Sequence, residues 1–357
     1  MTAFVFVVPA LGGHASGGTR YNAALVRELH ARGVDLVAVD PSELDRHCVA
    51  GGTRWVIIDS LYLAQHAELA ERARSLGARF VGLLAHYLPS LVHTGDSLID
   101  QLDECEARAV ATSDAVIVTS EFMREVLVRC GLAASRCCVL EPGCELERAV
   151  SLPSAAVGLR ALLVAHVVPG KGILELLTSL SSRLSPSDSF TLDIAGELGV
   201  DTAYAESCVR LVQREAALRQ RVDFLGCLSP AELCAAFVRH HVCVSASWME
   251  AYGMALAEAR TLGVPILARA GGNVEHHVRS EWGGELTADA AGLAAACVRL
   301  ARDPGELERR RLAAWKHAVP PRAWSRVAAE FEAALVALEA AVSRANRNNR
   351  TSGRTTT

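Results

Sequence analysis

The chain has 357 residues, of which 51% are apolar and 21% are charged, a composition typical of soluble globular proteins. This length exceeds what one hydrophobic core ordinarily supports, and it therefore predicts two domains. The formal net charge of -4, from 36 basic and 40 acidic residues, gives no broad positive field, so we expect no nucleic-acid partner.

The composition also bears on the compartment. No apolar run approaches the roughly 20 residues that span a bilayer. The apolar start, MTAFVFVVPALGG, has no charged segment before it, so we interpret it as a first buried strand and not as a signal peptide. The cysteines include no Cys-x-x-Cys pair and fit buried thiols in a reducing compartment. We expect a cytoplasmic protein, with peripheral contact at the inner membrane face left open.

Short apolar runs alternate with amphipathic helices along the first half of the chain. The expected strands are AFVFVV (3–8), VDLVAVD (34–40), WVIID (55–59), RFVGLLAH (79–86), AVIVTS (115–120) and CCVL (137–140). Helices are expected between them, for example in RYNAALVRELHARG (20–33). Nearly continuous apolar strands separated by helices indicate a parallel sheet with both faces covered.

The same alternation resumes after SLPSAAVG (151–158), which we interpret as a linker. The expected strands are LRALLVAHV (159–167), FTLDIAG (190–196), VDFLG (222–226), VCVSAS (242–247) and VPILAR (264–269). The sequence therefore predicts an α/β fold of two Rossmann-like, doubly wound domains, 1–150 and 159–320, facing each other across a cleft. A final helix is expected at 321–343 and a disordered polar tail at 344–357.

Ligands of such sheets bind beyond the carboxyl ends of the strands. In the first such loop, PALGGHASGG (9–18), Gly17 and Gly18 allow backbone to approach a ligand just before a helix whose N–H groups can bind an anion. A glycine turn without a ligand is the alternative, and a dinucleotide site is disfavoured because the loop has no G-x-G-x-x-G. His86 ends an apolar strand, where a structural and a ligand-facing role are both open.

A lysine turn opens the second domain. Lys171, in Pro169-Gly170-Lys171-Gly172, lies between a strand and a helix, where its ammonium can reach a phosphate beside free helix amides. The turn is not a Walker A motif, because the upstream glycine is missing and Gly172 occupies the Ser/Thr position. A solvated lysine without a ligand is the alternative.

Two glutamates flank a short glycine turn in MEAYGMALAEARTLGVP (249–265). Gly253 permits the turn, which places Glu250 on a loop and Glu258 in the second turn of the following helix. The amides between them can bind negative charge, and each carboxylate can accept hydrogen bonds from sugar hydroxyls. The pattern predicts a nucleotide-sugar site, because two ordinary surface glutamates are not expected among such small and apolar neighbours.

These motifs resemble the retaining GT-B glycosyltransferases of group 1, the GT4-like family, over nearly the whole chain. The resemblance rests on the glycine loop, the strand-end histidine, the P-x-K-G turn, VDFLGCLSPAEL (222–233), and above all E-x7-E followed by A-x-x-x-G-V-P. It implies a metal-independent enzyme without a cofactor that moves a sugar from a UDP- or GDP-linked donor to an acceptor hydroxyl, with retention of anomeric configuration. The first domain would be the acceptor side, the second would bind the nucleotide-sugar, and the last helix would return to the first domain.

The resemblance also implies roles for single residues. Glu258 is expected to bind the nucleotide ribose, Glu250 the transferred sugar and Lys171 the diphosphate. The remaining donor contacts are expected from the backbone of Ala251, Tyr252, Gly253 and Met254 at sugar and phosphate, from Gly17 and Gly18 at the phosphates, from Leu228 at the base, and from His86 at the transferred sugar. The expected catalytic residues are His86, Lys171 and Glu250, and no metal ligands are expected.

Two departures from the family pattern and two alternatives remain. Ala251-Tyr252 stands where Gly-Phe is commoner, which is the milder departure. His166 stands where the family usually has arginine, and a neutral imidazole would stabilise a diphosphate less, so we expect turnover to rise as pH falls. A nucleotide-sugar-binding subunit of low intrinsic activity that needs a catalytic partner is one alternative. An NAD-linked oxidoreductase is the other, although the glycine loop disfavours it. The acceptor can be a glycan, a lipid or a small metabolite.

Overall fold

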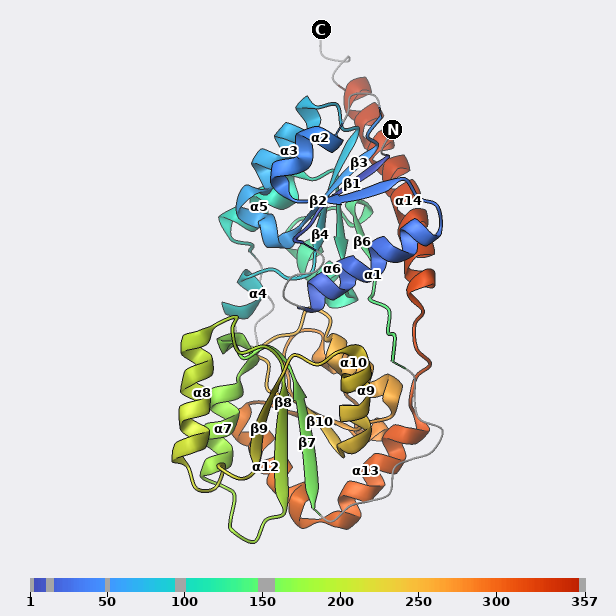
Figure 1. Ribbon diagram of the computed structural model, residues 1–357. Coiled ribbons are helices and arrows are strands. Elements are labelled where there is room, and N and C mark those ends of the chain that lie inside the picture. Colours follow the sequence, from blue (N-terminus) through green and yellow to red (C-terminus); the bar gives the residue numbers. More distant parts are fainter. Residues whose placement is uncertain (1–2, 11–15, 49–51, 94–100, 147–157, 353–357) are drawn as a thin grey trace. The chain divides into compact units, whose positions relative to one another are not determined.

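The computed structural model describes residues 3–10, 16–48, 52–93, 101–146 and 158–352. It divides into two compact units, one of residues 1–143 and 322–357 and one of residues 144–321 (Figure 1). None of the described helices has both the length and the apolar composition that crossing a bilayer requires. Apart from Gly158, the predicted linker 151–158 lies outside the described residues.

The first unit is built on a parallel sheet with the strand order β2-β1-β3-β4-β5-β6. Its strands are β1 (Phe4–Val7), β2 (Leu36–Val39), β3 (Trp55–Asp59), β4 (Phe80–Ala85), β5 (Ala115–Val118) and β6 (Cys137–Val139). Its helices are α1 (Gly17–Ala31), α2 (Leu44–His47), α3 (His66–Ser75), α4 (Ser90–His93), α5 (Glu104–Thr112), α6 (Glu121–Arg129) and α14 (Trp324–Ser352). Short 3-10 turns span Pro41–Glu43, Ser60–Gln65 and Ala134–Arg136.

Two hydrophobic layers cover the faces of this sheet. Phe6 and Leu84 pack in the layer that contains α1 and α14, whereas Val7 and Ile58 pack in the layer that contains α2 and α3. Successive side chains of a strand point to opposite faces, so a continuously apolar strand contributes to both layers. This explains why the strands of the first half are apolar runs without polar alternation.

The final helix, α14, completes the core of the first unit. Trp324, Phe331 and Leu335 are buried in the same layer as α1, and α14 and α1 contact each other (Figure 1). The Phe331 ring meets Phe6 edge-on, with ring centroids 5.5 Å apart. The predicted return of the last helix to the first domain is confirmed.

Helix α14 extends beyond its predicted end. It runs to Ser352, so residues 344–352, expected as part of a disordered tail, are helical. Adding a residue to an existing helix requires no new nucleation, so a polar segment without large apolar residues can continue it. Residues 353–357 lie outside the described part of the chain.

The second unit contains a parallel sheet with the strand order β12-β11-β10-β7-β8-β9. Its strands are β7 (Leu159–Val164), β8 (Phe190–Ala195), β9 (Val222–Gly226), β10 (Val242–Ser245), β11 (Ile266–Arg269) and β12 (Glu285–Thr287). Its helices are α7 (Ile173–Ser181), α8 (Thr202–Arg214), α9 (Pro230–Arg239), α10 (Met254–Leu262), α11 (Val274–His277), α12 (Ala290–Arg302) and α13 (Pro304–Lys316). Short 3-10 turns span Pro169–Lys171 and Ser280–Trp282.

The second sheet is also covered on both faces. Leu163 and Ile194 pack in the layer that contains α7, α8 and α12, and Leu162 and Cys243 pack in the layer that contains α9 and α10. Leu146 belongs to this second layer. The unit accordingly begins at Cys144, ahead of the first-domain end that the sequence suggested at 150.

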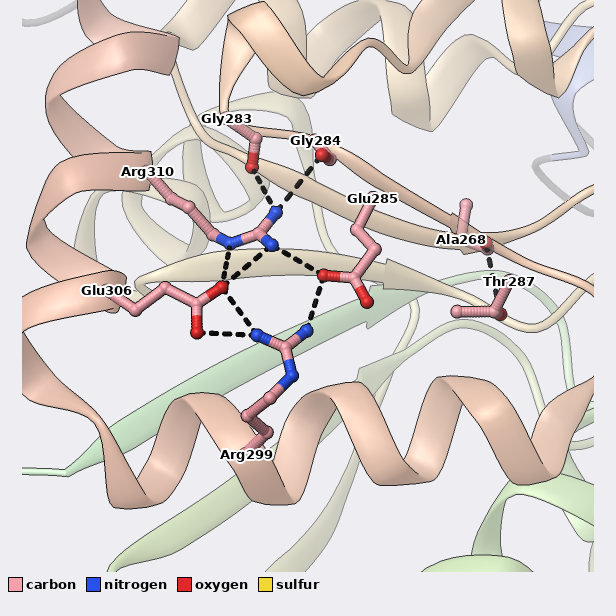
Figure 2. A network of polar contacts seen from close by, with 8 residues as sticks. All are labelled: Ala268, Gly283, Gly284, Glu285, Thr287, Arg299, Glu306 and Arg310. Atoms are coloured by element: carbon pink, nitrogen blue, oxygen red, sulfur yellow. Dashed lines mark hydrogen bonds and ion pairs between the residues drawn. The ribbon is translucent and has the colours of Figure 1, made fainter.

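A network of two arginines and two glutamates joins β12, α12 and α13 (Figure 2). Arg310 Nη2 donates to Glu285 Oε2 at 2.6 Å and to Glu306 Oε1 at 2.8 Å. Arg299 donates to the same two carboxylates, at 2.6 Å to Glu285 and 2.5 Å to Glu306. The hydrogen bonds from Arg299 hold the pKa of Glu306 below its ordinary value, although partial burial opposes this.

We expect Glu306→Gln to lower the free energy of unfolding by about 1 kcal/mol at pH 7, because it weakens charge-assisted hydrogen bonds shared by two arginines. The folded pKa of Glu306 is depressed, so its contribution is present above the unfolded value, about 4.3, and is lost as pH falls through the folded value. Urea unfolding of both proteins from pH 7 to pH 3 measures this difference.

The matched control is Glu206→Gln, which removes an exposed ion pair with Arg210 on α8 and should change stability little. If the loss of unfolding free energy in Glu306→Gln stays constant as pH falls, the depressed pKa assigned to Glu306 is contradicted.

Candidate functional site

The loops after β7, β9 and β10 of the second unit carry most of the predicted donor-binding residues. Because the strands are parallel, their carboxyl ends lie along one edge of the sheet. His166 follows β7, Leu228 follows β9 and Glu250 follows β10, whereas Glu197, which the sequence did not single out, follows β8. The fold thus brings to one edge motifs that are widely separated in sequence.

Lys171 ends a 3-10 turn that packs against the loop after β10. The Trp248 N–H donates to the Gly170 carbonyl at 3.0 Å. Gly172 has a φ of 61°, and a Cβ at this position would lie 2.2 Å from the Ala246 carbonyl oxygen. Both the backbone conformation and the close approach require glycine. Gly172 therefore fixes the backbone position from which the Lys171 side chain extends.

The Lys171 ammonium contacts the Glu250 carboxylate, with Nζ and Oε1 2.6 Å apart. The two side chains are 29% and 18% exposed, so the pair is shielded but still open to solvent. An ammonium carries three N–H donors, which leaves donors for phosphate oxygens beside the carboxylate. Such a pair can contact an anionic group and a hydroxyl group of one ligand.

The segment from Glu250 to Gly253 is held by the loop after β11. Glu250 forms a parallel bridge with Gly272, and the Asn273 N–H donates to the Glu250 carbonyl at 2.7 Å. Gly253, at the turn that the sequence predicted, has a φ of 90° and is the N-cap of α10. The first N–H groups of a helix have no carbonyl partner within it, so this end of α10 is suited to an anion.

Glu258 lies in the second turn of α10 and is 3% exposed. Cys243 on β10 is close to both glutamates: burial raises the pKa of its thiol to about 12, and the charges of Glu258 and Glu250 contribute to the rise. The two carboxylates therefore act on one buried thiol.

Three possible metal ligands lie at the ends of β7, β8 and β9. Ligand atoms of His166, Glu197 and Cys227 lie within 4.8 Å of one another, and this donor set would suit zinc. However, the Glu197 N–H donates to His166 Nδ1 at 3.2 Å, so the proton of the neutral ring is on Nε2. Neither ring nitrogen then offers a lone pair to a metal without loss of this hydrogen bond. We interpret His166 as a donor through Nε2 and assign no metal here.

In the first unit, the predicted residues Gly18 and His86 are in contact. A Cβ at Gly18 would lie 3.2 Å from His86 Cδ2, so the ring packs against the start of α1, which begins at Gly17. His86 Nε2 lies 2.9 Å from Asn22 Oδ1 and 3.4 Å from Asp59 Oδ2. Both oxygens are acceptors, so Nε2 carries the ring proton.

Asp59 is fully buried at the end of β3. Its Oδ2 accepts from Asn22 Nδ2 at 2.5 Å, and its Oδ1 accepts from the Leu61 N–H at 2.8 Å. Burial alone would raise the pKa of Asp59, but the hydrogen bond and charge of His86, with the bonds from Leu61 and Asn22, outweigh it and leave the pKa below its ordinary value. A buried carboxylate thus fixes the orientation of the His86 ring.

The sequence missed Asn22 and Asp59 as partners of His86. Asp59 does carry a signal, since it ends an apolar strand as His86 does, whereas nothing in the helical pattern distinguishes Asn22. Leu228 is partly buried against the layer of α9 and α10. Gly12 and Gly13 of the glycine loop lie outside the described residues.

The second unit matches a known family. Residues 159–303 match the model of the family described as Glycosyl transferases group 1. The chain is also similar to the GDP-mannose:cellobiosyl-diphosphopolyprenol alpha-mannosyltransferase of Xanthomonas campestris, with 29% identity over 154 residues. That alignment covers 43% of this chain and 40% of the relative, so the chain matches about two fifths of that protein's length. The resemblance predicted from the motifs is confirmed.

Solved structures share the fold over nearly the whole chain. Sucrose-phosphate synthase from Thermosynechococcus elongatus is similar with a TM-score of 0.74 and 19% identity, over 95% of this chain and 99% of that chain. Anabaena HepE in complex with UDP and glucose is similar with a TM-score of 0.73 and 16% identity, over 93% of this chain and 99% of that chain. With the two parallel α/β sheets, these likenesses confirm the predicted GT-B fold.

We expect Asp59→Ala to lower the free energy of unfolding by about 3 kcal/mol, because the buried donors of Asn22, His86 and Leu61 lose their common acceptor. Urea unfolding followed by circular dichroism measures the change. Asp45→Ala is the matched control, since its carboxylate pairs with Arg72 at the surface and its loss should have little effect. Equal effects of the two substitutions would show that Asp59 does not organise this cluster.

Proposed function

We propose that this chain, whose residues 159–303 match the group 1 glycosyl transferases, moves a sugar from a nucleoside diphosphate to an acceptor hydroxyl with retention of anomeric configuration. The observation that carries the proposal is the 2.6 Å contact of Lys171 with Glu250, next to the N-terminus of α10. The ammonium and the helix amides suit a diphosphate, and the carboxylate suits the hydroxyls of the attached sugar.

The proposed roles of the other residues extend from this contact. Glu258 binds the ribose, Leu228 borders the base, and the backbone from Ala251 to Met254 contacts the sugar and its phosphate. In the first unit, Gly17 and Gly18 approach the phosphates and His86 lies beside the transferred sugar. The Asn22 and Asp59 contacts hold His86 Nε2, which supports a fixed orientation for its second nitrogen toward a ligand.

In the proposed reaction, the bond between the anomeric carbon and the diphosphate oxygen breaks while the acceptor oxygen bonds to the same carbon. The proton of the acceptor hydroxyl passes to the leaving diphosphate. Negative charge grows on that diphosphate, so Lys171 and the amides of α10 stabilise the transition state, where one fixed donor can contribute roughly 3 kcal/mol. Family likeness supports retention without a metal, and the sequence contains no Asp-x-Asp motif.

Two donor bases are supported by the similar proteins. The name of the Xanthomonas relative specifies GDP-mannose, and HepE structures contain UDP and UDP-glucose. A thermal-shift panel of UDP, GDP and their sugars tests the proposal, since a ligand at 100 times its dissociation constant adds about 2.7 kcal/mol to stability. If no nucleotide stabilises the chain, the proposed function fails. If the chain is stabilised but releases no nucleoside diphosphate with any acceptor class, the binding-subunit alternative is favoured.

Glu258→Gln should weaken binding of the stabilising nucleotide by about tenfold or more, because a hydrogen bond to a charged acceptor becomes one to a neutral acceptor. Isothermal titration calorimetry measures the dissociation constant. Glu281→Gln, at an exposed position in the same unit, is the control and should bind as the wild type does. Unchanged affinity of Glu258→Gln would remove this glutamate from the donor site.

His166→Arg should raise kcat several-fold at pH 8 and flatten the dependence of kcat on pH, because a guanidinium stays charged and can bind phosphate oxygens at two points. The wild-type His166 accepts from the Glu197 N–H at Nδ1, a contact that fits the neutral ring. Steady-state rates from pH 6 to pH 9 measure the effect. Identical profiles for both proteins would show that His166 does not limit stabilisation of the diphosphate.

A further inference from the structure

We infer that His277 and Asn273 are positioning residues for the donor diphosphate: they hold the Tyr252 carbonyl and thereby set the direction of the Gly253 N–H. The inference rests on the proposed function, because it assigns these side chains a task in donor binding. Neither residue belongs to the motifs that identified the site, and both lie in or beside α11.

Both side chains donate to the same carbonyl oxygen. His277 Nε2 lies 2.7 Å from Tyr252 O, and Asn273 Nδ2 lies 2.8 Å from it. A carbonyl oxygen can only accept, so His277 carries its proton on Nε2 and Asn273 faces Tyr252 with its amide nitrogen. His277 is 2% exposed and Asn273 is 6% exposed. The two donors are therefore shielded from competing water.

The carbonyl contact determines where the next amide points. In a planar trans peptide the C=O and N–H groups point in opposite directions. Because the Tyr252 carbonyl faces Asn273 and His277, the Gly253 N–H faces away from α11. Gly253 is the N-cap of α10, so this N–H directly precedes the first amides of that helix. The two side chains thus orient one more donor at the proposed diphosphate position.

Glycine makes this restraint necessary. Gly253 has a φ of 90°, and glycine can adopt both signs of φ at little cost, so Gly253 itself offers little resistance to rotation of the preceding peptide. The His277 ring packs against this position: a Cβ at Gly253 would lie 3.3 Å from His277 Cδ2. The same ring meets Tyr252 edge-on, with centroids 5.1 Å apart. Packing and hydrogen bonding therefore restrain one peptide.

His277 is suited to be a permanent neutral donor. Its Nδ1 is buried without a hydrogen-bond partner among the described residues, and protonation there would bury an unpaired charge. Burial lowers the pKa of His277 to about 3, and the nearby His276 and Arg260 add to the effect. The donor at Nε2 is thus retained at every pH at which the protein is expected to work.

The inference predicts a selective loss of diphosphate affinity. The segment that contains Gly253 is proposed to contact both the sugar and its phosphate, and the phosphate that carries the sugar is the β-phosphate. A disturbed Gly253 N–H should therefore weaken binding of UDP or GDP and leave binding of UMP or GMP nearly unchanged. A merely structural role of His277 would weaken binding of both kinds of nucleotide together.

The test measures dissociation constants of the full chain for UDP, UMP, GDP and GMP by calorimetry. His277→Phe keeps a buried ring but removes the donor, and it should lower the ratio of diphosphate to monophosphate affinity about tenfold. His277→Gln restores an N–H donor and should recover most of the ratio. Asn273→Ala removes the second donor and should lower the same affinity ratio by a smaller factor. If His277→Phe does not fold, Asn273→Ala alone tests the inference. Glu275→Gln, at an exposed position of the same helix, is the control and should match the wild type.

An unchanged affinity ratio in folded His277→Phe or Asn273→Ala overturns the inference, and so does a failure of His277→Gln to restore it. A wild-type chain that binds neither UDP nor GDP overturns the proposed function and this inference with it. A wild-type chain that binds a diphosphate, with variants of unchanged ratio, overturns the inference alone.

Discussion

Backbone pairing between the loops after β10 and β11 sets the geometry of the functional edge in the second unit. Glu250 bridges to Gly272, and a Cβ at Gly271 would lie 2.2 Å from the Trp248 carbonyl oxygen. The Lys171 turn packs against the same loop through Trp248. Three loops from neighbouring strands therefore form one packed body, and glycines make the close approaches possible. Lys171 and Glu250 meet because backbone contacts hold together the loops that carry them.

In each unit, buried polar side chains orient a group that is proposed to contact the donor. In the first unit, an ionised Asp59 is shielded and satisfied by Asn22, His86 and Leu61. In the second unit, neutral His277 and Asn273 share the Tyr252 carbonyl. Such groups are costly to bury unless their hydrogen bonds are made. Once made, the same bonds resist reorientation, because turning one of these groups away deprives a buried polar atom of its partner.

Local sequence patterns were sufficient to predict most of the strands and helices. The apolar runs located every strand of both sheets except β12 (Glu285–Thr287), which is a short edge strand with intermediate or exposed side chains. Periodicity also located α14 but ended it too early, because a polar surface gives no apolar repeat to follow. The functional motifs were found where glycine and charge stand out from apolar neighbours. Asn273 and His277 were missed, since a short polar helix after two glycines gives no such contrast.

The sequence by itself determined that parallel strands alternate with helices, and hence that the charged loops gather at carboxyl edges of two sheets. Strand and helix periodicity are local properties, so they can be recognised without knowledge of packing. Only the tertiary structure decided that Lys171 Nζ lies 2.6 Å from Glu250 Oε1, and that two side chains in and beside α11 converge on one carbonyl of the loop after β10. Such contacts depend on how loops from separate strands pack, and no pattern within either segment specifies that.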